Sequence, residues 1–180
     1  MKRPLLLAAV LVLLHQSPAM CQWYDVESGA PVADSSWRKT KDGFGAVLVV
    51  TDEFNSSRKE WVNSDGSALP AIHVANSIRR GDVVLVPVFF THTEGVEGPV
   101  QPEVGYRILQ PDGSIVSEMP FRSAWGKETT EAGEIYICHV ALKFFVEPEE
   151  PLGGYFIIAN CRQNQLSAAV TLTQRIEVTK

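Results

Sequence analysis

The sequence predicts an all-β chain that folds as a single antiparallel sandwich of about seven strands. Three observations favour this fold class. Apolar and polar residues alternate in several short segments, most clearly in 134–146. Turn residues separate these segments at short spacing. Almost no segment has the period of an amphipathic helix.

Residues 1–21 have the layout of a secretory signal peptide. Lys2 and Arg3 form a basic start, the ten residues 5–14 are all apolar, and small and polar residues follow. A run of this length is too short to span a bilayer. We therefore expect a mature chain without a transmembrane segment, exported to the periplasm or secreted. Cleavage is expected after Cys21 or, alternatively, after Ala19.

The charge of the mature chain argues against one class of partner. Loss of Lys2 and Arg3 lowers the 16 basic residues to 14 against 21 acidic residues, which gives a net charge of −7. Nucleic-acid binding needs a basic surface that displaces counterions from phosphates. We therefore expect no nucleic-acid partner.

The first part of the mature chain is the least regular. Residues 22–43 are polar with scattered aromatic residues, and we interpret them as an irregular N-terminal arm before a domain at 44–180. The apolar run GAVLVVT at 45–51 predicts the first strand. Residues 52–62 have apolar residues at a spacing that fits one short helix.

Residues 71–78 and 83–90 predict the next two strands. The second, VVLVPVFF, is apolar on both faces, which is typical of a central strand. Pro87 conflicts with a central position, because proline has no amide proton to donate to a ladder. We therefore expect a bulge at Pro87 or pairing on one side only.

A β-hairpin follows. Residues 104–109 and 114–119 flank the turn at 110–113, Gln-Pro-Asp-Gly, in which glycine tolerates a left-handed backbone. Long loops at 91–103 and 120–133 precede and follow the hairpin.

Three more segments complete the predicted sandwich. They are 134–146, 155–161 and 170–178, with turns at 147–154 and 162–167. One face of the first holds Tyr136, Cys138, Val140, Leu142, Phe144 and Val146. We expect Cys138 to point into the core.

Cys138 and Cys161 are the two cysteines that remain if Cys21 leaves with the signal peptide. An even pair in an oxidising compartment predicts a disulfide. Two layouts permit the bond. The cysteines lie either on opposite sheets, with the bond crossing the core, or opposite each other in one hairpin.

The order of three motifs carries a resemblance. They are GDVVLVPVFF at 81–90, GYRILQPDGS at 105–114 and EPEEPLGGYFIIA at 147–159. In this order they resemble the immunoglobulin-like modules of bacterial surface proteins, including macroglobulin-type domains. The wider layout, with FGAVLVVT at 44–51 and Trp61 after it, is similar to small exported bacterial proteins of no assigned function. The resemblance implies an immunoglobulin-like sandwich over about 44–178 and transfers no catalytic residue.

The sequence gives only weak indications of catalytic or metal-binding residues. Cys138 and His139 are neighbours on a predicted strand, so their side chains point to opposite faces and form no dyad. His92 and Glu94 offer two metal ligands, but without a third partner we interpret them as solvated loop residues. We predict no catalytic residue, no cofactor and no metal site.

The sequence therefore favours an exported, non-catalytic module that binds a protein or an envelope component. Sandwiches bind through their end loops, so Trp125, His92 and Glu94 are the candidate binding residues. Two alternatives stay open, an extracytoplasmic metal-dependent hydrolase built on His92 and Glu94, and a secreted protease inhibitor. Asn55 begins an Asn-Ser-Ser glycosylation acceptor, whose use depends on the source of the protein.

Overall fold

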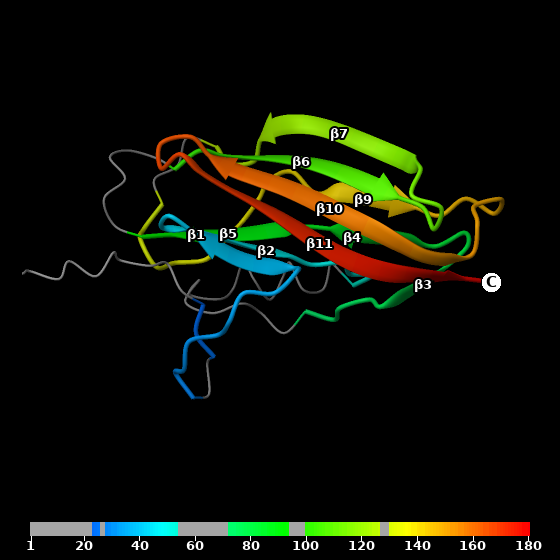
Figure 1. Ribbon diagram of the computed structural model, residues 1–180, viewed down its shortest axis with the longest axis horizontal. Coiled ribbons are helices and arrows are strands. Elements are labelled where there is room, and N and C mark those ends of the chain that lie inside the picture. Colours follow the sequence, from blue (N-terminus) through cyan, green and yellow to red (C-terminus); the bar gives the residue numbers. More distant parts are fainter. Residues whose placement is uncertain (1–22, 26–27, 54–71, 94–99, 127–129) are drawn as a thin grey trace, which may run out of the picture.

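The computed structural model describes residues 23–25, 28–53, 72–93, 100–126 and 130–180. These residues form eleven strands in two facing layers, which confirms the all-β class (Figure 1). No helix in these ranges has the length and apolar character needed to cross a membrane. The predicted signal peptide and most of the predicted helix at 52–62 lie outside the described residues.

The first layer is built around β2 and β5. It contains a four-stranded sheet in the order β1–β2–β5–β8, in which all neighbours are antiparallel. The strands are β1 (Arg38–Lys41), β2 (Phe44–Leu48), β5 (Val88–His92) and β8 (Tyr136–Ile137). β1 lies inside the segment that the sequence indicated as an irregular arm.

Pro87 divides the segment that was predicted to be one strand. Before it, β4 (Val83–Val86) pairs with β9 (Leu142–Phe145), and after it β5 pairs with β2 and β8. The Pro87 carbonyl accepts a hydrogen bond from the Val49 amide at 3.1 Å. Pro87 therefore lies between two strands that belong to different sheets. At this position no strand pairing requires a backbone amide proton, which proline lacks.

The second layer is a five-stranded sheet in the order β3–β11–β10–β6–β7. Its strands are β3 (Ser77–Arg79), β6 (Pro102–Leu109), β7 (Ile115–Ser123), β10 (Gly153–Gln163) and β11 (Ala168–Thr179). β3 runs parallel to β11, so the expectation of a purely antiparallel sandwich is wrong at this edge. A parallel neighbour is possible here because the chain between β3 and β11 is long enough to cross over.

The predicted hairpin is present and is longer than expected. The Gln110 amide donates to the Ser114 carbonyl at 3.0 Å across the turn, and β7 then continues past Met119 to Ser123. Pro120 is tolerated within β7 because this strand is the edge of its sheet.

The segment 134–146 forms two strands where one was predicted. β8 and β9 are separated at 138–141, where the Cys138 amide donates to Val88 and the His139 amide donates to Ala124. The predicted inward face is largely retained, since Cys138, Leu142, Phe144 and Val146 are all buried.

The core lies between the layers. Phe44 and Phe90 from the first layer belong to one buried cluster with Tyr106 and Tyr155 from the second. A smaller cluster covers the opposite face of the first layer, where Trp23 packs with Val47, Val49 and Phe89.

Candidate functional site

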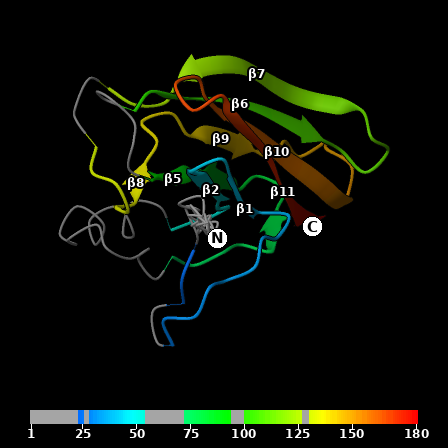
Figure 2. The same cartoon turned by 60° about the vertical axis from the view of Figure 1, so that its left-hand side comes forward.

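The two long loops that the sequence indicated as binding loops leave the strands at one end of the molecule. β5 ends there at His92, and β6 begins there at Pro102. Glu103 of β6 pairs with Ser123, the last residue of β7, so β7 ends there as well. The Gly133 amide donates to the His92 carbonyl at 2.9 Å, which joins the second loop to the end of β5. In Figures 1 and 2 the yellow chain around β8 and the orange β10–β11 turn both lie at this end. We call the end of the molecule that carries His92, Glu103, Ser123 and Gly133 the loop end.

Trp125 is the main aromatic residue of the loop end. Its partly buried indole makes edge contacts with Phe90 and Tyr136, at centroid distances of 5.5 and 5.1 Å. The exposed imidazole of His139 lies against it at 4.6 Å. Trp125 is therefore packed on the core on one side and covered by a polar ring on the other.

The Tyr136 hydroxyl fixes the loop beside this cluster. It accepts a hydrogen bond from the Glu131 amide at 2.6 Å and donates to the Glu134 carboxylate at 2.8 Å. Partial burial is the main cause that raises the pKa of Tyr136. The hydroxyl therefore remains a donor at neutral pH.

A second aromatic contact, between the Arg162 guanidinium and the Phe121 ring, lies near the start of β6. The Arg162 guanidinium lies 4.2 Å from the centre of the exposed Phe121 ring and donates to Glu103 at 2.6 Å. Asn164 also donates to Glu103, at 3.1 Å. The hydrogen bonds from Arg162 and Asn164 lower the pKa of Glu103.

His92 is buried and fully hydrogen-bonded. Its Nδ1 lies 2.9 Å from the Thr93 carbonyl, and its Nε2 lies 2.9 Å from the Thr130 hydroxyl. A carbonyl only accepts, so we assign the proton to Nδ1 and the acceptor role to Nε2. The interpretation of His92 as a solvated loop residue is therefore wrong, because the side chain is buried at the end of β5 and both ring nitrogens are bonded within the protein. This environment favours a structural histidine, and it gives the alternative hydrolase no support. Glu94 lies outside the described residues.

Cys138 and Cys161 are buried free thiols that belong to the same core cluster. Burial raises the pKa of Cys161 to about 12, and burial together with the nearby Cys161 raises the pKa of Cys138 well above its usual value. Burial also raises the pKa of Tyr106, with smaller contributions from both cysteines. The Cys138 segment bonds to β5 of the first layer, and Cys161 lies on β10 of the second. Of the two predicted layouts, this is the one on opposite layers, and the disulfide itself stays a prediction.

The predicted turn at 147–154 lies at the opposite end of the molecule (Figure 1). There Glu150 accepts a hydrogen bond from the Tyr155 hydroxyl at 2.8 Å. Burial, followed by this bond, raises the pKa of Tyr155. The turn is thus tied to β10. Asn55 lies outside the described residues.

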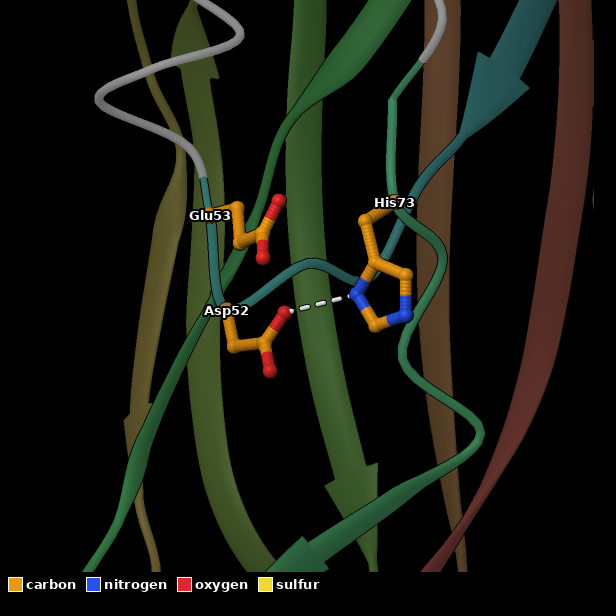
Figure 3. A group of neighbouring side chains, drawn as sticks. All are labelled: Asp52, Glu53 and His73. Atoms are coloured by element: carbon orange, nitrogen blue, oxygen red, sulfur yellow. Dashed lines mark hydrogen bonds and ion pairs between the residues drawn. The ribbon is translucent and has the colours of Figure 1, made fainter.

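Asp52, Glu53 and His73 form a surface cluster that the sequence did not predict (Figure 3). One ligand atom from each residue lies within 4.8 Å of the other two, and all three side chains are exposed. Asp52 Oδ1 is 2.9 Å from His73 Nδ1. This hydrogen bond is the largest cause that lowers the pKa of Asp52 and raises the pKa of His73.

The backbone around this cluster is fixed by hydrogen bonds between segments. The Ala75 amide donates to Val50 at 2.8 Å, and Thr51 exchanges two hydrogen bonds with Leu85 at 2.9 and 2.8 Å. The Glu53 amide donates to the Thr51 hydroxyl at 3.1 Å. The 72–75 segment is therefore held beside the end of the β2 segment, which brings His73 to residues 21 positions earlier in the chain.

Comparison with known proteins identifies no family. No family model matches the chain, and no curated protein matches it. Solved structures share a low similarity. The C-terminal domain of wzt is 12% identical with a TM-score of 0.43, over 82% of this chain and 80% of that one. A Niemann-Pick type C2 protein from the Japanese carpenter ant is 16% identical with a TM-score of 0.39, over 73% and 89%.

A family 123 glycoside hydrolase from Clostridium perfringens is 9% identical with a TM-score of 0.43. The match covers 75% of this chain, which spans only 27% of the hydrolase. TM-scores at this level carry no argument about function.

Proposed function

We propose that this chain is an exported, non-catalytic module with an immunoglobulin-like arrangement of its two β layers, which binds a protein or a cell-envelope component through the loop end. The observation that supports this proposal is that the described residues flanking both loops lie at one end of the molecule, where Trp125 is partly exposed. Rigid layers that present loops at one end are a common arrangement for binding.

Trp125 has the properties of an interface anchor. Large aromatic residues supply apolar contact area with little loss of conformational entropy, and tryptophan is enriched among the residues that dominate binding energy. Its contacts with Phe90 and Tyr136 hold the indole in one orientation before any partner arrives. A partner then orders few side chains on binding, which favours affinity.

The test is capture of a partner from envelope extracts of the source organism by the tagged mature protein, with comparison of two tryptophan variants. Trp125→Ala removes the proposed anchor. Trp37→Ala is the matched control, because Trp37 is exposed, directly precedes β1 and lies outside the loop end. We expect Trp125→Ala to weaken capture by about 30-fold, equivalent to about 2 kcal/mol, and Trp37→Ala to leave it unchanged.

Thermal unfolding of each variant separates loss of binding from loss of fold, because Trp125 also packs on the core. His139→Ala gives a second comparison, since it uncovers the indole without removing it. Equal capture by the wild type and by a folded Trp125→Ala protein would contradict the placement of the site.

A further inference from the structure

We propose that Asp52, Glu53 and His73 form a surface site for one divalent transition-metal ion of the zinc class. The site is distinct from the loop end and does not depend on the proposed binding function. It combines two carboxylates with one imidazole, contributed by two segments of the chain (Figure 3).

The ligand atoms are close enough for a single ion. Bonds from zinc to nitrogen and oxygen ligands are about 2.0–2.2 Å long, so two ligands at tetrahedral angles lie about 3.4 Å apart. One atom from each of the three residues already lies within 4.8 Å of the others. Small side-chain rotations complete the geometry.

The ion replaces the contact between Asp52 and His73. Asp52 Oδ1 and His73 Nδ1 are 2.9 Å apart, and Figure 3 shows the Glu53 carboxylate on the same side of the imidazole. An ion between them needs this pair to open by about half an ångström. The carboxylate–imidazole contact thus already orients the ring nitrogen toward the ion position.

The ligand set selects the class of metal. Magnesium and calcium prefer sites made only of oxygen atoms, whereas imidazole suits zinc, copper and nickel. Three protein ligands leave at least one position of a tetrahedral zinc ion for water or for a group from another molecule. The exposure of all three residues leaves that position open to solvent.

The backbone supports the site from both segments. The hydrogen bond from the Ala75 amide to the Val50 carbonyl holds His73 beside Asp52 without the metal. The ligands are therefore largely placed in the folded chain and separated in the unfolded chain. An ion that binds only the folded state raises its stability in proportion to the logarithm of ion concentration.

The test is calorimetric titration of the purified protein with zinc chloride in buffer that contains excess magnesium. We expect one zinc ion per chain. His73→Ala and Asp52→Asn each remove one ligand and should weaken binding by at least about tenfold. Glu118→Gln is the matched control, because it removes the same charge from an exposed carboxylate on β7, at the sheet edge opposite β3, and it should leave the affinity unchanged.

Copper provides an independent readout. The electron paramagnetic resonance spectrum of the copper-loaded protein should show coupling to one nitrogen, and this coupling should disappear in His73→Ala. The proposal is overturned if zinc does not bind, if it binds His73→Ala or Asp52→Asn as tightly as the wild type, or if calcium binds more tightly than zinc. Equal binding by the variants would indicate an adventitious ion on surface carboxylates only.

Discussion

At the residue scale, His92 shows how burial decides the role of a polar side chain. Its two ring nitrogens bond to the Thr93 carbonyl and the Thr130 hydroxyl, and both His92 and Thr130 are buried. A buried acceptor that loses its donor is not rehydrated, so it carries the full penalty of desolvation. The Thr130 hydroxyl therefore stabilises the loop end through His92.

Thr130→Val tests this role. Valine has nearly the shape of threonine but cannot donate to Nε2, so we expect the free energy of unfolding to fall by about 1–3 kcal/mol. Thr171→Val is the control, because the Thr171 hydroxyl bonds to Asn160 on the exposed face of the sheet, where water replaces it. Urea denaturation monitored by tryptophan fluorescence measures both. Equal losses in the two variants would argue against a special role for the buried pair.

At the scale of elements, the register shift between β6 and β7 depends on Gly105. The shift lies between Val104 and Tyr106, and β7 passes so closely that a Cβ on Gly105 would lie 3.2 Å from the Met119 carbonyl oxygen and from the Phe121 amide nitrogen. Both atoms belong to the backbone, so a side chain does not simply swing away. The glycine is required for the close approach of the edge strand.

Gly105→Ala should therefore lower the free energy of unfolding by about 1–3 kcal/mol, as expected when an extra methyl group forces a shift of backbone. Gly154→Ala on β10 is the comparison, since the atoms nearest to its Cβ would belong to the exposed guanidinium of Arg175, at the far end of a flexible side chain that can turn aside. We expect Gly154→Ala to be close to neutral. A Gly105→Ala protein as stable as Gly154→Ala would show that β7 adapts without strain.

The elements that the sequence predicted best are those with a simple alternating pattern. β6, β10 and β11 fall within or around the predicted segments, because one face of each is buried in the core and the other is not. The breaks at Pro87 and at 138–141 were harder to predict, because they depend on a change of pairing partner. Each residue of β3 pairs with a residue of β11 that lies 100 positions later in the sequence. No local sequence pattern encodes such a pairing.

At the scale of the whole molecule, the folded chain creates neighbours that spacing does not indicate. The placement of the Trp125 loop at one end follows from the order of strands and was predictable. The cluster of Asp52, Glu53 and His73 was not, because the 21 positions between Asp52 and His73 match no metal-binding spacing. The two layers also bring Cys138 and Cys161 together from segments that bond to different sheets.

A disulfide between Cys138 and Cys161 would link the two layers through the core. Protein isolated from an oxidising compartment should carry this bond, because both thiols belong to the same buried cluster and the compartment favours oxidation. The bond closes a loop of about 24 residues, so we expect it to contribute roughly 3 kcal/mol to the free energy of unfolding. Guanidinium unfolding with and without reductant measures this difference.

Alkylation in denaturant, followed by mass spectrometry, decides whether the bond exists. Denaturant is needed because burial and raised pKa values keep both groups protonated and inaccessible in the folded protein, where they would escape labelling even if reduced. In a chain cleaved after Cys21, the bonded protein takes up no label without reductant and two labels after reduction. Two labels on the unreduced chain would mean that no disulfide links the two layers and that packing alone holds them together. This result would also count against export to an oxidising compartment, because that export is the main reason to expect the bond.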